Sequence, residues 1–168
     1  MPRSFDIVFE SPATVEQVHA AFGNESYWHA RNAAFTGGEK TLESLTVEPD
    51  GTVRVVVKED LTHGALPGML TKIYRGDLNI VTTEVWTPAG DGTVTGVIDV
   101  AVVGAPGRGG GTALLAPAGT GSRMDLTGTI EFKMPLVGGP IESFLAKEFA
   151  QGIPDIQRFT AEWLGENA

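Results

Sequence analysis

The chain has 168 residues, a formal net charge of −9 at pH 7 and no cysteine. This length suits one domain over residues 1–168, and the lack of cysteine excludes disulfides, thiolate metal sites and cysteine nucleophiles. The negative charge repels nucleic acid and anionic lipid surfaces, so we expect neutral or cationic small molecules, or other proteins, as partners and no nucleic acid. No apolar run approaches the ~18 residues that span a membrane, and residues 1–10 lack the apolar stretch of a signal peptide. These features predict a cytoplasmic protein without integral membrane association.

The N-terminal part of the chain predicts one strand followed by two short helices. Apolar residues alternate with polar ones from Phe5 to Phe9, which is the period of a half-buried strand. Ser11 then provides a helix cap with proline behind it, and Gly23 ends the helix. A second short helix is expected over residues 25–34.

From Lys40 onward the period becomes that of antiparallel strands joined by hairpins. Strands are expected over residues 40–47, 53–57, 78–86, 94–103, 112–117 and 123–134. The segment 104–111, GAPGRGGG, lacks the ending of a phosphate-binding loop and precedes a strand, so we interpret it as a mobile hairpin loop. Residues 61–77 show no clean period and are expected to form a long connection.

The C-terminal part predicts one long helix over residues 140–164, because its apolar residues recur every three or four positions. Gly152 and Pro154 interrupt this pattern, so the helix is expected to bend or break there. Either the bend and the glycine open a ligand cavity beneath the helix, or the bend follows the twisted sheet and Gly152 allows close packing. On the first interpretation, Gly152→Leu would preserve folding but fill the cavity.

These elements together predict an α+β fold. A curved antiparallel sheet of about six to seven strands has one apolar face, and the long C-terminal helix is the element able to cover it. The sheet is therefore expected to wrap around this helix, with the two short helices following the first strand.

The element order and two phrases resemble the START-like superfamily, also called the SRPBCC or helix-grip fold. The phrases are SPATVEQVHAAF after the first strand and MPLVGGPIESFLAKEF before the last helix. The chain is most similar to an uncharacterised actinobacterial branch of that superfamily. The resemblance implies a cavity between sheet and helix, as in lipid carriers, plant hormone receptors and polyketide cyclases. It implies no catalytic residues, because the superfamily shares no catalytic motif that is recognisable in this chain.

The strand over residues 78–86 carries a candidate pocket wall. Thr82, Glu84 and Trp86 share one face, where polar groups beside an aromatic ring could orient a ligand. In the alternative, that face is exposed and Val81 and Val85 point inward. The full set of expected ligand-binding residues is Glu84, Trp86, Ile98, Met124, Ile130 and Phe132 from the sheet, with Phe149, Gly152 and Ile156 from the helix.

We therefore predict a binding protein for a hydrophobic or amphipathic small molecule, such as a lipid, isoprenoid or polyketide, without a cofactor. One alternative is an enzyme of the cyclase or dehydratase type, with Glu84, His29 or His63 as acid or base. Another is a protein-interaction domain whose core is filled by its own side chains. The histidines have no metal-ligand spacing, so no metal site is expected. Glu148 is expected to be solvated at the edge of the helix.

Two further apolar clusters have alternative interpretations. Tyr27 and Trp28 could gate the mouth of the cavity or simply pack the second short helix. Leu66, Met69 and Leu70 could form a lid over a hydrophobic entrance or anchor their loop in the core.

Overall fold

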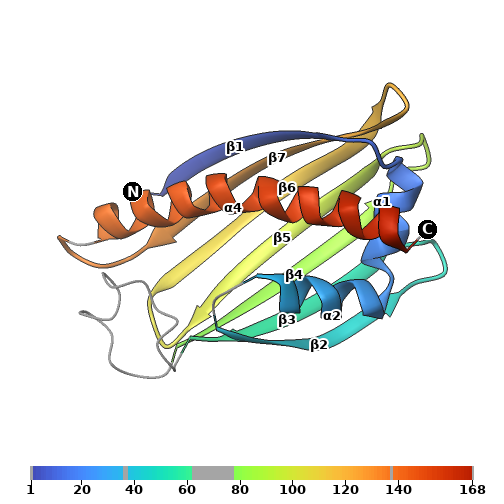
Figure 1. The fold of residues 1–168 in the computed structure, drawn as a ribbon. Coiled ribbons are helices and arrows are strands. Elements are labelled where there is room, and N and C mark those ends of the chain that lie inside the picture. Colours follow the sequence, from blue (N-terminus) through green and yellow to red (C-terminus); the bar gives the residue numbers. More distant parts are fainter. Residues whose placement is uncertain (1, 36–37, 62–77, 137, 168) are drawn as a thin grey trace.

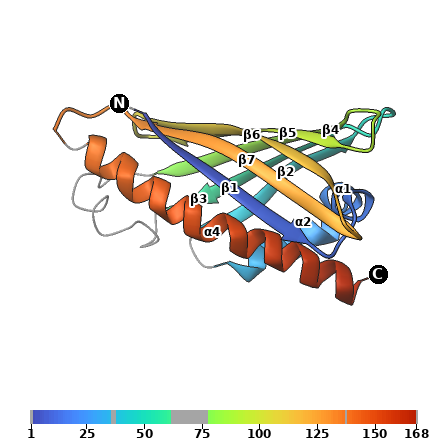
Figure 2. The same cartoon turned by 90° about the horizontal axis from the view of Figure 1, so that it is seen from above.

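The protein is a seven-stranded antiparallel sheet that curves along one side of a long helix (Figures 1 and 2). The structure is a computed structural model and describes residues 2–35, 38–61, 78–136 and 138–167. Its strands are β1 (Arg3–Ser11), β2 (Glu39–Val47), β3 (Val53–Asp60), β4 (Asn79–Pro88), β5 (Val94–Val103), β6 (Gly107–Ala118) and β7 (Gly121–Phe132). Its helices are α1 (Val15–Phe22), α2 (Glu25–Ala34) and α4 (Gly138–Glu166). The predicted α+β helix-grip fold is thus confirmed.

The strands follow one another as an antiparallel meander. Their order in the sheet is β1-β7-β6-β5-β4-β3-β2, so β1 closes one edge beside β7 and β2 forms the other edge. Helix α4 lies across the concave face and packs mainly on β1 and β7, while α1 and α2 stand near its C-terminal half (Figures 1 and 2). This arrangement leaves the middle of the sheet, around β4 to β6, facing the helix.

Strand β6 begins earlier than the sequence predicts. The glycine segment expected to be a hairpin loop is part of this strand from Gly107 onward, and Gly109 to Gly111 pair with β5 on one side and β7 on the other. Strand pairing uses backbone groups, so a run of glycines can pair even though it shows no alternation of side chains. Residues 104–106 form the turn, but the prediction of a mobile loop was wrong for residues 107–111.

Helix α1 begins three residues later than the Ser11 cap predicts. Thr14 is the N-cap: its side chain accepts a hydrogen bond from the Gln17 amide, and the Gln17 side chain accepts one from the Thr14 amide. This reciprocal arrangement satisfies two amides that the first turn leaves open. Ser11 instead ends β1, and its hydroxyl accepts a hydrogen bond from the Ala13 amide.

Helix α4 runs continuously through Pro154 rather than breaking there (Figure 2). Both of its halves are anchored: Ile141 is buried against Phe132 near the start, and the buried Thr160 bonds to Tyr27 near the end. Tertiary contacts of this kind can offset the local penalty of an internal proline, about 3 kcal/mol. The expected helix over residues 140–164 is found, slightly extended at both ends.

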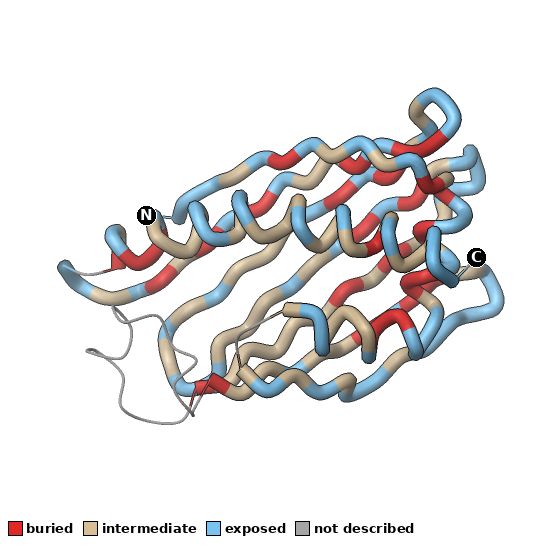
Figure 3. Tube along the Cα trace, in the orientation of Figure 1, coloured by how far each residue is buried: buried red, intermediate tan, exposed pale blue. Residues whose placement is uncertain are grey.

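The main hydrophobic core lies at the α1 end of the sheet, where buried positions gather (Figure 3). Phe22, Tyr27 and Trp28 are almost completely buried there, and the ring of Phe22 lies 4.7 Å from that of Trp86. Tyr27 and Trp28 therefore pack the core, as the second interpretation of this cluster predicted. Along residues 97–103 of β5 and 107–112 of β6 no residue is buried, and the inward-facing residues, such as Ile98 and Gly109, are only half-buried.

Candidate functional site

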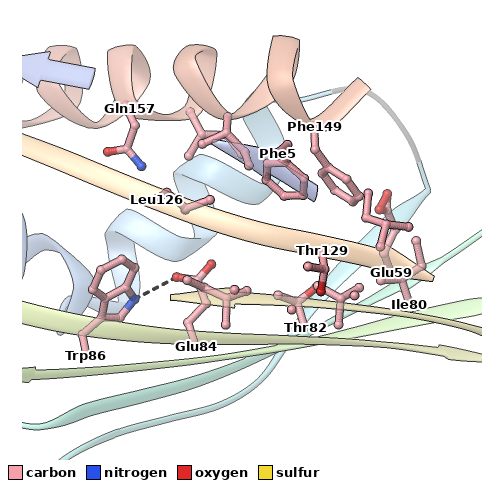
Figure 4. A pocket seen from close by; sticks show the side chains of 18 of the residues that line it. Phe5, Glu59, Ile80, Thr82, Glu84, Trp86, Leu126, Thr129, Phe149 and Gln157 are labelled. Atoms are coloured by element: carbon pink, nitrogen blue, oxygen red, sulfur yellow. Dashed lines mark hydrogen bonds between the residues drawn. The ribbon is translucent and has the colours of Figure 1, made fainter. Parts of the chain in front are cut away.

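A cavity of about 240 Å³ lies between helix α4 and the concave face of the sheet. Strands β4 to β7 provide its floor, α4 forms one wall, and Phe5 of β1 closes the side next to that helix (Figure 4). The described lining residues are Phe5, Phe22, Arg31, Glu59, Ile80, Thr82, Glu84, Trp86, Ile98, Val100, Gly109, Gly110, Gly111, Leu126, Thr129, Ile130, Phe149, Ile153, Ile156 and Gln157.

Three glycines of β6 line the floor of the cavity, Gly109, Gly110 and Gly111. Strand register places Ile98 opposite Gly111, and Gly111 opposite Gly128. One step along the same face, Val100 lies opposite Gly109. A Cβ atom added at Gly111 would lie 2.5 Å from the Thr127 carbonyl oxygen of β7, so the close approach of the neighbouring strand requires glycine here. Glycine inside a strand often marks a place where a ligand or another chain segment comes close.

The helix side of the cavity is mostly apolar. Phe149, Ile153 and Ile156 follow one another at helical spacing and all line the cavity, with Gln157 at the end of the row. The Phe149 ring stacks on the Phe5 ring with their centroids 6.0 Å apart (Figure 4). This contact connects α4 to strand β1 and closes one side of the space.

A charged group lies within these apolar walls. Glu84 is buried, and its two carboxylate oxygens have different partners. Arg31 of α2 donates to Oε1 over 3.2 Å, and the indole nitrogen of Trp86 donates to Oε2 over 2.9 Å (Figure 4 draws the second bond). Two hydrogen bonds thus fix the orientation of this carboxylate.

Arg31 is held from several sides. Its guanidinium carbon lies 4.6 Å from the centre of the Trp28 ring, a cation–π arrangement. Burial lowers the pKa of Arg31, but the Glu84 carboxylate and Tyr27 raise it, and the balance is a pKa above the ordinary value. For the Tyr27 hydroxyl, burial has the opposite effect and raises the pKa, although the nearby Arg31 cation lowers it in part. Arg31 therefore remains a cation and Tyr27 remains neutral at physiological pH.

A second cavity of about 140 Å³ adjoins the first on the side of α2, β2 and β3. Its described lining residues are Trp28, Arg31, Asn32, Phe35, Lys40, Val55, Val57, Glu59, Ile80, Thr82, Glu84 and Ile156. Lys40 and Glu59 form an ion pair of 3.7 Å in its wall, and the Lys40 ammonium also donates to the Phe35 carbonyl over 3.2 Å. Arg31 and Glu84 belong to both cavities, so their ion pair stands at the junction.

The structure brings six of the nine sequence-predicted ligand-binding residues into the wall of the larger cavity. These are Glu84, Trp86, Ile98, Ile130, Phe149 and Ile156. Because Glu84 and Trp86 are buried and line the cavity, their face of β4 is the inward one, in preference to the face of Val81 and Val85.

The other three predicted residues lie elsewhere. Met124 is buried in the main core at the α1 end, and Phe132 packs on Ile141 beneath the start of α4. They share the inward face of β7 with Ile130 but lie beyond the two ends of the cavity. At Gly152, an added Cβ would have no described atom within 4 Å outside the helix's own backbone, so this glycine neither lines the cavity nor allows close packing.

Sequence reasoning missed several residues of the wall. Arg31 gave no local signal, because its partner Glu84 is 53 positions away. Gly109 and Gly111 could have been found from the rule that glycine in a strand marks a close approach, had the strand been extended to include them. Phe5 was placed correctly on an inward face, but the sequence does not show that α4 meets it.

Some of the residues considered as acid or base candidates lie outside the cavity. His29 is exposed and pairs with Glu25 on the surface over 3.1 Å, and Glu148 is exposed on α4. His63 and the apolar residues Leu66, Met69 and Leu70 lie outside the described residues. Within the described ranges, no three acidic or histidine side chains are grouped so as to hold a metal ion. The same ranges contain no helix both long and apolar enough to cross a membrane.

The sequence matches a known family over almost its whole length. The family model described as a protein of unknown function, DUF2505, matches residues 6–164, and the chain belongs to this family. The uncharacterized protein Rv0481c of Mycobacterium tuberculosis is 39% identical over 173 residues, which cover 99% of each chain. An uncharacterized protein of Mycobacterium bovis matches equally well. These relatives agree with the predicted uncharacterised actinobacterial branch.

Solved structures with low sequence identity share the fold. TTHA0849 from Thermus thermophilus has a TM-score of 0.61 at 17% identity, and each chain is covered to 99%. Ara h 8.0201 has a TM-score of 0.60 at 11% identity, again with 99% of each chain covered. A START superfamily protein from Mycobacterium smegmatis has a TM-score of 0.55 at 10% identity, covering 98% of this chain and 99% of that one. The predicted START-like fold is thereby confirmed.

Proposed function

We propose that this member of the DUF2505 family binds a hydrophobic or amphipathic small molecule in the cavity between α4 and the sheet. The observation that carries the proposal is the cavity of about 240 Å³ above the glycines of β6. Protein interiors are normally packed as densely as organic crystals, and unfilled volume in a core destabilises the fold. A fold that keeps such a space therefore fits a role in which a ligand occupies it.

The size of the cavity limits the ligand. An apolar cavity of about 150 Å³ is enough to bind benzene, and pockets for drug-sized ligands begin at about 300 Å³. The larger cavity lies between these values, and the adjoining one adds about 140 Å³. The expected ligand is thus larger than a single ring, and the two cavities together match the lower range of small-molecule pockets.

The driving force would be burial of apolar surface. Removing about 200 Å² of ligand surface from water would contribute about 5 kcal/mol, from which the loss of ligand freedom must be subtracted. The apolar side chains of α4 and β5 provide the matching surface, and the likeness to a START superfamily protein supports the same assignment. We therefore propose binding by sequestration, with no chemical step.

The two alternative functions have less support. Of the three acid or base candidates named from the sequence, Glu84 is the one that lies in the described cavity wall. Its oxygens are already bonded to Arg31 and Trp86, which suits a fixed polar anchor better than a group that exchanges protons. The cavity itself argues against an interaction domain with a completely filled core.

Native mass spectrometry of the freshly purified protein, beside a denatured control, would test the proposal. A bound mass that disappears on denaturation is the expected result, and that mass would identify the ligand class. If only the bare protein is seen, the measurement is repeated after incubation with neutral lipids, isoprenoid alcohols and aromatic polyketides. Failure to bind any of them would contradict the proposal.

A further inference from the structure

The two cavities differ in polarity. The larger one has apolar side chains from β5, β7 and α4, such as Ile98, Leu126 and Ile153. The smaller one carries Arg31, Lys40, Glu59 and Glu84 in its wall, and all of these except Lys40 also line the larger cavity where the two adjoin. A ligand that occupies both would therefore place its apolar body beneath α4 and its polar end towards α2 and β3.

The charges around the polar end cancel. Among the described residues that line the smaller cavity there are two cations and two carboxylates. They form two pairs, Arg31 with Glu84 at 3.2 Å and Lys40 with Glu59 at 3.7 Å. Each of these side chains is mostly buried, with between 9% and 21% of its surface exposed.

This pairing disfavours a charged ligand. A ligand carboxylate bonded to Arg31 would share that cation with Glu84, and a ligand ammonium bonded to Glu84 would share that carboxylate with Arg31. In either case the described lining would hold one buried charge without a counter-charge, which is unfavourable in a poorly hydrated site. This cost should weaken the binding of ligands with a charged head group and should not affect ligands with an uncharged one.

An uncharged polar group fits the junction without breaking either pair. A guanidinium has five N–H donors, of which Glu84 takes one, and a carboxylate oxygen can accept more than one hydrogen bond. A hydroxyl placed between Arg31 and Glu84 could accept from the first and donate to the second. A carbonyl oxygen could accept from Arg31 alone.

We propose that the ligand is an uncharged amphipath, with its apolar body in the larger cavity and a hydroxyl or carbonyl group at the Arg31–Glu84 ion pair. This inference rests on the proposed function and narrows it to a ligand class. It assigns Arg31 and Glu84 as the residues that select against charged ligands.

Three probes with the same alkyl chain test the selection in the unaltered protein. Decanol, decanoate and decylammonium are compared at neutral pH, below the concentrations at which they form micelles. Each is used to displace phenylnaphthylamine, a neutral fluorescent dye that responds to apolar surroundings. Decanol is expected to bind at least about tenfold more tightly than either ion, a difference well above the error of such a titration. Decanoate or decylammonium binding as tightly as decanol would overturn the inference.

A variant of the ion pair reverses the selection. Glu84→Gln removes the negative charge and leaves Arg31 as an unbalanced cation, so the ratio of decanoate to decanol affinity should rise at least about tenfold. Glu148→Gln makes the same change on the exposed face of α4 and should leave the ratio unaltered. An unchanged ratio in a folded Glu84→Gln protein would overturn the assignment. If that variant does not fold, the ranking in the unaltered protein decides alone.

The failure of this inference differs from the failure of the proposed function. Equal binding of all three probes, or dye binding without decanol binding, overturns the uncharged amphipath but leaves a hydrophobic binding site. Absence of binding by the dye and all three probes overturns both.

Discussion

The two ends of the space between α4 and the sheet are built differently. At the α1 end, Phe22, Tyr27 and Trp28 are no more than 1% exposed, and Trp86 packs on them. Glu84 lies two residues before Trp86 on the same face of β4, and the cavity of about 240 Å³ opens there. One continuous sheet thus carries a filled core and a hollow side by side.

Glycines at the two ends have different surroundings. Gly96 in the filled end lies beneath the Trp86 ring, and a Cβ atom there would come within 2.4 Å of it. At Gly111 in the hollow end, an added Cβ atom would lie 2.5 Å from the Thr127 carbonyl oxygen of β7. In the first case the glycine makes room for an aromatic ring of the protein, and in the second it allows the backbone of the neighbouring strand to come close. We infer that stability comes mainly from the filled end and binding from the hollow one.

The largest expected effect comes from removing a ring at the filled end. Trp28→Ala should lower the free energy of unfolding by about 3–5 kcal/mol, because it deletes a buried indole. The same change also removes the indole's 2.7 Å hydrogen bond to the Phe22 carbonyl. Ile98→Ala in the hollow end should cost less than about 2 kcal/mol, because one side of Ile98 already faces open space. Urea unfolding of both variants checks the comparison, and equal losses would refute it.

A smaller effect is expected at a glycine of β7 that lies beneath the Phe5 ring. A Cβ at Gly128 would lie 2.5 Å from the Phe5 ring, so Gly128→Val must push that ring aside. Overpacking of this kind should destabilise the protein by about 1–3 kcal/mol. Thr127→Val introduces the same side chain on the exposed face of β7 and serves as the control. Thermal unfolding would measure both, and a neutral Gly128→Val would mean that Phe5 does not hold its place.

The hydrogen bond between Tyr27 and Thr160 of α4 should contribute about 1 kcal/mol to the free energy of unfolding. Thr160 donates its hydroxyl to the Ile156 carbonyl, so the Tyr27 hydroxyl donates to Thr160 over 2.6 Å. Tyr27→Phe loses this bond, which for a buried neutral pair is worth about 1 kcal/mol. Denaturant unfolding at pH 7 would measure the loss, and no loss would show that the bond does not hold α4 to α2.

Tyr27 also predicts that the stability of the fold depends on pH in the alkaline range. The pKa of Tyr27 is raised in the folded state by burial, from a reference value of 10.0. Its contribution to stability is therefore fully present below pH 10 and is lost as the pH rises from there through the folded-state pKa. The loss of stability above that pH should be shallower in Tyr27→Phe, and identical slopes in the two proteins would contradict the assignment.

The smallest effect is expected at a glycine that belongs to neither end. Gly152 lies inside α4 with open space where a Cβ would stand, so alanine should fit without strain. Gly152→Ala should raise the free energy of unfolding by about 0.5–1 kcal/mol through helix propensity alone. Ligand binding should not change, and a clear loss of binding would return Gly152 to the candidate site.

The fold could be predicted because its patterns are local. The alternation from Leu126 to Phe132 and the helical spacing from Ile141 to Trp163 each depend on neighbours in the sequence. The glycine part of β6 could not be found in this way, because residues without side chains show no alternation. Its pairing depends on β5 and β7, which the local pattern does not contain.

The site was harder to predict for the same reason. Ile130, Met124 and Phe132 share one face of β7, and the sequence shows that shared face but not which stretch of it remains uncovered. That is decided by where the rings of the α1 end and the start of α4 come to lie. The pairing of Arg31 with Glu84 likewise depends on the docking of α2 over β4.

The most direct test of the hollow end uses two valines of β5 that face opposite ways. Val100 lines the cavity, whereas Val97 is 56% exposed on the outer face. The affinity for phenylnaphthylamine is measured for the unaltered protein, Val100→Phe and Val97→Phe. If the cavity binds apolar ligands, Val100→Phe should weaken binding at least about tenfold, while Val97→Phe should match the unaltered protein. Equal affinity in all three folded proteins would contradict the account.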